Sequence, residues 1–252
     1  MDVPYVVIAP ERGPRADAPV VVAYHLLDVP NTESGFAEAV PLRGLDAWKV
    51  YLGLPLSGAR TPAGGVAELE RLAMEDAVLN VHGPVTLGAV AEFPAAYAMV
   101  RKRFGIDADV PVGLMGGSVG GAVAQLVLAE GGVRAKAAVL INPVVRLRPT
   151  VEGLAAHYRQ SYRWSPASDE IASRIDFLRR ASELDGIAIR YITGADDNVD
   201  AILNPVAEVV AEMEKRGNPV DHRVVPEMAH AVTPHAAEVD RLALEWFQRH
   251  LL

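Results

Sequence analysis

The sequence of 252 residues contains no cysteine. The chain can therefore form no disulfide, bind no metal through thiolates and use no cysteine as a nucleophile. This composition fits a reducing compartment. Residues Met1 to Pro4 also lack the basic and apolar segments of a signal peptide, and no apolar run approaches the roughly 20 residues that span a bilayer. Together these absences favour a cytoplasmic location.

Positive charge is scarce, because 24 Lys and Arg face 32 Asp and Glu, which gives a formal net charge of −8. Nucleic-acid phosphates and anionic lipid repel such a chain, so neither nucleic acid nor a membrane is expected as a partner. The seven histidines show no i, i+2 or i, i+4 spacing, and no Gly-x-Gly-x-x-Gly or Walker motif occurs. The sequence therefore predicts no metal site and no cofactor.

Hydrophobic residues are plentiful, at 50% of the chain, and many of them fall in short, β-branched runs. Near-continuous apolar runs of this length are typical of strands that are buried on both faces of a parallel sheet. The runs are Tyr5–Ile8, Val20–Tyr24, Trp48–Leu52, Val112–Met115, Ala138–Ile141, Ile187–Ile192 and His222–Val225.

Longer stretches with helical apolar spacing separate these runs. They are Ala91–Phe104, Gly121–Glu130, Pro205–Arg216 and Ala236–Leu252. The alternation predicts an α/β fold over residues 1–252, a single domain with a mostly parallel central sheet and helices on both faces.

Residues 143–184 interrupt this alternation. Helical spacing within them predicts an inserted pair of helices that forms a small lid. The last helical stretch has enough apolar surface to dock on the body of the domain and also to suit a homodimer. That surface comprises Leu242, Leu244, Trp246 and Phe247.

The most informative motif is Gly116-Gly117-Ser118-Val119-Gly120, a Gly-x-Ser-x-Gly sequence. It lies between a strand-like run and a helix-like run, where a serine would occupy a strained turn with its hydroxyl exposed. Gly116 and Gly120 would allow the close backbone approach that such a turn requires. Ser118 is therefore the candidate nucleophile. The alternative is a glycine-rich turn that only links a strand to a helix.

A serine nucleophile needs a histidine as base and an acid that orients the histidine. Candidates for both follow strand-like runs further along the chain, and the carboxyl ends of parallel strands meet at one edge of a sheet. His230 is the expected base because it lies directly after its strand. His235 is the alternative, although it lies where the last helix should begin.

Two adjacent carboxylates, Asp196 and Asp197, follow the run that ends at Ile192. Both cannot face one imidazole, so one of them is expected to cap a turn or to lie in solvent. Position in the loop leaves the choice between them open. Asp200 is a more distant third candidate.

Three segments resemble the α/β-hydrolase superfamily, namely Gly116–Gly121, Gly194–Asp197 and Pro226–His230. The resemblance extends from Tyr5 to Leu251 and is strongest to dienelactone-hydrolase-like and prolyl-oligopeptidase-like hydrolases and to small carboxylesterases. It implies the α/β-hydrolase fold and a catalytic triad of Ser118, Asp197 and His230, with the acid three residues after a glycine. Dienelactone hydrolases themselves use a cysteine nucleophile, which this chain lacks.

Backbone N–H groups of Val119 and Leu26 are the expected oxyanion hole. Val119 opens the helix after the nucleophile, where the first amides and the helix dipole point towards the substrate carbonyl. The family commonly supplies the second donor from a His-Gly pair or a glycine-rich run, whereas this chain has Tyr24-His25-Leu26-Leu27-Asp28. Leu26 is the expected donor and Leu27 the alternative, while the ring of His25 is expected to hold this loop.

Three aromatic residues of the inserted segment, Tyr158, Tyr162 and Trp164, are candidates for lining a substrate pocket. The alternative is that they pack the inserted helices onto the body of the domain.

Together these features predict a carboxylesterase-like serine hydrolase that cleaves a small-molecule ester or acyl substrate through an acyl-enzyme. A peptidase or amidase, or an acyltransferase or thioesterase, would use the same triad. A non-catalytic ligand-binding protein on the hydrolase fold is a further alternative, which the presence of all three triad residues disfavours.

Overall fold

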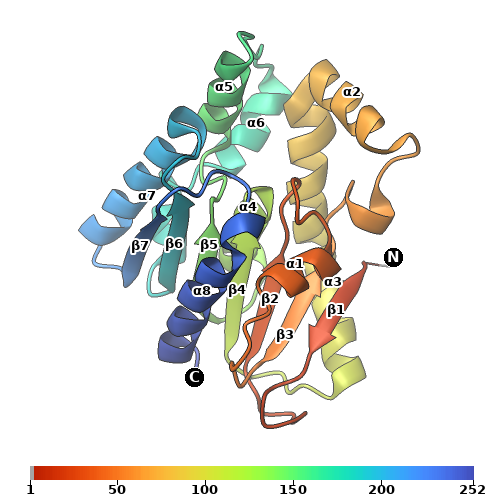
Figure 1. Cartoon of the computed structure of the whole chain (residues 1–252), viewed down its shortest axis with the longest axis vertical. Coiled ribbons are helices and arrows are strands. Elements are labelled where there is room, and N and C mark those ends of the chain that lie inside the picture. The colour runs from red at the N-terminus through yellow and green to blue at the C-terminus, as the bar shows by residue number, and fades with distance from the viewer. Residues whose placement is uncertain (1–2) are drawn as a thin grey trace.

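The computed structural model describes residues 3–252, which form a seven-stranded sheet with the order β1-β3-β2-β4-β5-β6-β7 (Figure 1). The strands are β1 Tyr5–Ile8, β2 Val20–Tyr24, β3 Trp48–Leu52, β4 Val112–Gly117, β5 Ala135–Ile141, β6 Ala188–Gly194 and β7 Val220–Val225. β1 runs antiparallel to β3, and every other neighbouring pair is parallel. The predicted sheet is therefore confirmed, and each predicted run overlaps one strand. Met1 and Asp2, part of the stretch in which no signal peptide was expected, lie outside the described residues.

Helices connect the strands and cover both faces of the sheet. They are α1 Glu33–Ala39, α2 Gly65–Ala77, α3 Gly83–Phe104, α4 Val119–Glu130, α5 Leu147–His157, α6 Pro166–Arg174, α7 Asn204–Lys215 and α8 Ala236–His250. Shorter 3-10 turns occur at Gly58–Arg60, Ala181–Leu184 and Thr233–His235, and π-helical turns at Val78–His82 and Val199–Leu203. Within residues 3–252, no helix combines the length and the apolar character needed to cross a membrane.

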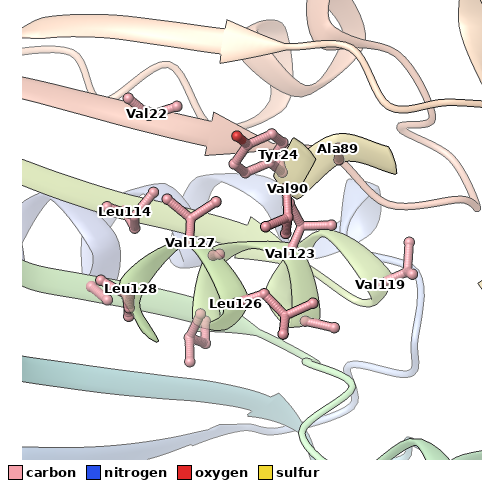
Figure 2. Close-up of a cluster of buried hydrophobic side chains, with 14 of the residues drawn as sticks. Val22, Tyr24, Ala89, Val90, Leu114, Val119, Val123, Leu126, Val127 and Leu128 are labelled. Carbon is pink, nitrogen blue, oxygen red and sulfur yellow. The ribbon is translucent and has the colours of Figure 1, made fainter. Parts of the chain in front are cut away.

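The strand β2 shows how the two layers of the core arise. Successive side chains of a strand point to opposite faces, and all five residues of β2 are buried. Val22 and Tyr24 belong to the cluster that includes residues of α3, α4 and α7, whereas Val21 and Ala23 belong to the cluster that includes residues of α1 and α8. Figure 2 shows the first cluster, in which side chains of α4 lie beside those of β2, β4 and α3.

Two helical segments lie beyond the carboxyl ends of the parallel strands, at the top of Figure 1. One is the predicted insertion, residues 143–184, which forms α5 and α6. The other is α2, which was not predicted. It buries no residue, and two glycines with positive φ mark its start, namely Gly64 at the N-cap and Gly65 as its first residue. A hydrogen bond of 2.5 Å from the hydroxyl of Tyr162 to Asp76 links the two segments.

The last helix, α8, packs on the sheet. It does so through apolar side chains that were expected to suit a homodimer. Leu242, Trp246 and Phe247 are buried within the chain. A Cβ atom added at Gly113 of β4 would lie 2.8 Å from the Phe247 ring, so this ring rests directly on the strand backbone. These side chains are used inside the molecule, and the homodimer stays a prediction.

This packing predicts that Phe247→Ala lowers the free energy of unfolding by about 3–5 kcal/mol, because it removes a buried ring and leaves a cavity on β4. Urea unfolding followed by circular dichroism measures the change. Met74→Ala is the control, because Met74 is 82% exposed on α2 and its truncation should change stability by less than about 0.5 kcal/mol. Equal urea midpoints for the two variants would contradict the prediction.

Candidate active site

The turn between β4 and α4 places Ser118 at the carboxyl edge of the sheet. Ser118 has φ 51° and ψ −120°, a strained combination for a residue other than glycine. The surrounding backbone is too close for side chains. A Cβ atom on Gly116 would lie 2.1 Å from the carbonyl oxygen of Gly120, and one on Gly120 would lie 2.3 Å from that of His25. These contacts hold α4 against the end of β2 and present the serine hydroxyl beyond the strands.

His230 connects the hydroxyl of Ser118 to the carboxylate of Asp197. Its Nε2 lies 2.8 Å from Ser118 Oγ, and its Nδ1 lies 2.8 Å from Asp197 Oδ2. The Asp197 side chain is 2% exposed and that of His230 is 29% exposed. A buried carboxylate at Nδ1 favours the tautomer with a proton on Nδ1, which leaves Nε2 free to accept the hydrogen bond from the serine.

The competing candidates lie elsewhere. Asp196 and Asp200 are exposed. His235 lies in an exposed turn, where its Nε2 is 3.2 Å from the carbonyl oxygen of Glu227. Of the predicted catalytic residues and their alternatives, the structure brings together Ser118, Asp197 and His230.

The pKa of His230 reflects opposing influences. Burial of the ring is the largest and lowers the pKa, whereas the hydrogen bond with Asp197 and the charges of Asp197 and Asp28 raise it. The net result is a pKa above the ordinary histidine value. Only the neutral ring can accept a proton from serine. His230 therefore becomes available as a base as the pH rises through its own raised pKa.

The loop after β2 lies beside the nucleophile turn, as the assignment of Leu26 requires. A Cβ atom on Gly117 would lie 2.4 Å from the Leu26 side chain. Within residues 3–252, the Leu26 amide donates no hydrogen bond. Val119 is the first residue of α4. The oxyanion roles of Val119 and Leu26, with Leu27 as the alternative, stay predictions.

The ring of His25 fixes this loop, as expected. Its Nδ1 donates to the carbonyl oxygen of Leu26 at 2.6 Å, and its Nε2 accepts from the amide of Leu54 at 3.0 Å. This pattern requires the neutral ring, and burial lowers the pKa of His25 accordingly.

The three aromatic candidates differ in environment. Tyr158 is 71% exposed. Tyr162 and Trp164 pack edge to face with ring centroids 4.7 Å apart, and the guanidinium of Arg148 lies 4.0 Å from the Trp164 ring centre. Tyr162 and Trp164 also pack against the main hydrophobic core, as the packing alternative describes. A pocket-lining role stays a prediction.

No group of three or more histidine, aspartate or glutamate side chains within residues 3–252 is arranged to hold a metal ion. The side chains that the hydrogen bonds bring together at this edge of the sheet are the serine, the imidazole and the carboxylate.

Comparison with known proteins identifies the family to which the chain belongs. The prolyl oligopeptidase family matches residues 88–252. The chain belongs to the prolyl oligopeptidase family. That family consists of serine hydrolases with the α/β-hydrolase fold, so the chain is an enzyme of the serine hydrolase type. No curated protein sequence matches the chain.

Solved structures share this fold at low sequence identity. TT1662 from Thermus thermophilus is 19% identical with a TM-score of 0.64, and the match covers 99% of this chain and 98% of that one. An acylaminoacyl peptidase from Pyrococcus horikoshii is 17% identical with a TM-score of 0.65, and the match covers 100% of this chain but 40% of that one. A monoacylglycerol lipase from Paleococcus ferrophilus is 12% identical with a TM-score of 0.61, with 98% of both chains covered.

One residue beside Ser118, His230 and Asp197 was not predicted from the sequence. Asn142 directly follows β5, is fully buried and has φ 42°. A signal was present, because a polar residue ends an apolar run immediately before Pro143. Asparagine is among the residues that tolerate a positive φ.

The electrostatics predict that Asp28→Asn lowers the pKa of His230, because it removes a negative charge that favours the imidazolium. Histidine proton NMR titration measures this pKa, and the signal is assigned by its loss in His230→Gln. The difference between wild type and variant should shrink in high salt, since Asp28 is exposed.

Asp196→Asn is the matched control, because it removes an equal charge from an exposed residue beside the acid. It should leave the His230 titration close to that of the wild type. The same titration curve for wild type and Asp28→Asn at low salt would contradict the assigned influence.

Proposed function

We propose that this chain hydrolyses carboxylic esters of small molecules through an acyl-enzyme formed on Ser118. The observation that carries the proposal is the continuous hydrogen-bonded chain from Ser118 Oγ through His230 to Asp197, with both contacts at 2.8 Å. The prolyl oligopeptidase family match over residues 88–252 supports the same chemistry.

In the first half of the reaction, Ser118 Oγ attacks the ester carbonyl while its proton moves to Nε2 of His230. The buried carboxylate of Asp197 stabilises the imidazolium that forms. When the tetrahedral intermediate collapses, the bond to the leaving alcohol breaks and the alcohol takes the proton from His230. In the second half, His230 activates a water molecule in the same way, and the acid is released from Ser118.

The amides of Val119 and Leu26 stabilise the negative oxygen of the tetrahedral intermediates. The unpaired amide of Leu26 and its position beside the nucleophile turn support this assignment. Preformed donors of this kind cost no reorganisation during the reaction, and removing one typically slows a hydrolase about 10²- to 10³-fold. His25 contributes by holding the Leu26 carbonyl, so that the amide stays near the site.

Peptide or amide hydrolysis is the second candidate, and the prolyl oligopeptidase family match favours it. The two substrate classes place different demands on His230. An amine leaves only when it is protonated, whereas an activated alcohol leaves with little help. A triad that cleaves amides therefore also cleaves activated esters, but the converse does not hold.

The substrate class is tested by comparing p-nitrophenyl esters of increasing acyl length with p-nitroanilides of N-acylated amino acids. Ester turnover without anilide turnover supports the esterase. Anilide kcat/KM equal to or above that of the matched ester would overturn it in favour of the peptidase.

Ser118→Ala is predicted to lower kcat about 10⁴- to 10⁶-fold on any substrate that the wild type cleaves, because the attacking hydroxyl is lost. A fluorophosphonate probe should label the wild type, and mass spectrometry should find the label on Ser118. Label on another residue, or full turnover by Ser118→Ala, would sink the proposed nucleophile.

The acid is tested by a pair of adjacent substitutions. Asp197→Asn should lower kcat by about 10⁴-fold, because the amide no longer holds the tautomer in which Nε2 accepts the serine proton. Asp196→Asn changes an exposed neighbour and should leave kcat within about twofold of the wild type. The reverse ranking in steady-state assays would assign the acid to Asp196.

A further inference from the structure

Asn142 lies where the loops that carry the three triad residues meet. It is the first residue after β5, and β5 lies between β4, which leads to Ser118, and β6, which leads to Asp197. Its side chain is fully buried. A buried primary amide is costly unless its donors and acceptor are paired, so the partners of this group show what it does.

Those partners are the backbones of the other two loops. Nδ2 of Asn142 donates to the carbonyl oxygens of Ala229 and His230, each at 3.1 Å. Its Oδ1 accepts from the amide of Gly194 at 2.8 Å. Both amide protons and the carbonyl oxygen are therefore used, and they tie the loop of the base to the loop of the acid.

The residues beside Asn142 hold the backbone of the nucleophile. The amide of Ser118 donates to the carbonyl oxygen of Ile141 at 2.9 Å, and its carbonyl oxygen accepts from the amide of Val144 at 3.0 Å. The backbone amide of Asn142 donates to Ile192 of β6 at 2.8 Å. Residues 141–144 thus hold both the amide and the carbonyl group of Ser118. The side chain of Asn142, within the same segment, binds the loops that carry His230 and Asp197.

We propose that Asn142 is a positioning residue for catalysis, which fixes the backbone of His230 so that its ring reaches both Ser118 and Asp197. The inference rests on the proposed function, because it assigns Asn142 a part in keeping the His230 base in reach of both partners. Triad geometry tolerates little displacement, and a shift of about 1 Å in a reacting group can cost about 10²-fold in rate.

The chemistry explains why asparagine suits this position. An aspartate of the same size would direct a carboxylate oxygen at the carbonyl oxygens of Ala229 and His230, which repel it. An alanine would leave these two carbonyls and the Gly194 amide unpaired, and the positive φ would add strain. A glycine keeps the backbone conformation and removes only the side-chain contacts.

Asn142→Gly is therefore the primary test. We expect kcat on a p-nitrophenyl ester to fall about 10- to 100-fold with KM changed less than about threefold, and the rate of fluorophosphonate labelling to fall in parallel. We also expect the pKa of His230, measured by NMR titration, to fall, because its hydrogen bond with Asp197 is among the influences that raise it.

Asn218→Asp is the matched control. Asn218 also ties two loops, accepting from the amide of Gly186 at 3.0 Å and donating to Asp185 at 2.8 Å, but it lies at the amino end of β7, at the opposite edge of the sheet. Its substitution should lower the melting temperature and leave kcat and the His230 pKa as in the wild type. A folded Asn142→Gly with wild-type kcat and His230 pKa overturns the proposal.

Asn142→Asp tests the same proposal if Asn142→Gly does not fold. Its introduced carboxyl can donate one hydrogen bond when protonated and none when ionised. Its kcat/KM relative to the wild type should therefore fall as the pH rises, and wild-type activity throughout would overturn the proposal. A wild type that the fluorophosphonate probe does not label and that turns over no ester would refute the proposed function instead. In that case, the NMR titration of His230 still shows whether Asn142 sets the contact between His230 and Asp197.

Discussion

The close approach of the backbone at the nucleophile turn is the constraint on which the site depends. There is no room for a Cβ atom at Gly116 or Gly120, where it would lie 2.1 and 2.3 Å from backbone carbonyl oxygens. This contact seats α4 against the end of β2 and forces the strained conformation of Ser118. The same contact therefore places the serine hydroxyl beside the start of α4 and the loop after β2.

The parallel sheet then supplies the partners of that hydroxyl. β4, β5, β6 and β7 are adjacent, and their carboxyl ends carry Ser118, Asn142, Asp197 and His230 respectively. Strand neighbours lie about 4.8 Å apart, so side chains of the terminal loops can reach across two strands. Burial of Asp197 keeps its charge close to the imidazole, and the amide of Asn142 holds the backbone beneath that imidazole. The electrostatic and the geometric requirements of a triad are met by one edge of one sheet.

The helix α2 and the segment 143–184 lie beyond this edge (Figure 1). α2 buries no residue, and the segment 143–184 is joined to it by the hydrogen bond from Tyr162 to Asp76. Changes on α2 would alter the surroundings of the site without disturbing the core, whereas the segment 143–184 contributes buried residues such as Phe177 and Leu184 to the core. The proteins that share the fold are named as a peptidase and a monoacylglycerol lipase at 17% and 12% identity.

The sequence by itself determined the strands and the candidates for nucleophile and base, because apolar runs and Gly-x-Ser-x-Gly are local patterns. It did not decide between Asp196 and Asp197 by position, and the preference for Asp197 rested on resemblance. Only the tertiary structure, by burying Asp197 and exposing Asp196, brought one carboxylate to the imidazole. It also revealed α2 and the contacts of Asn142, whose partners lie 52, 87 and 88 positions away. Hydrogen bonds between distant loops follow from how the strands are ordered in space, and no local pattern records that order.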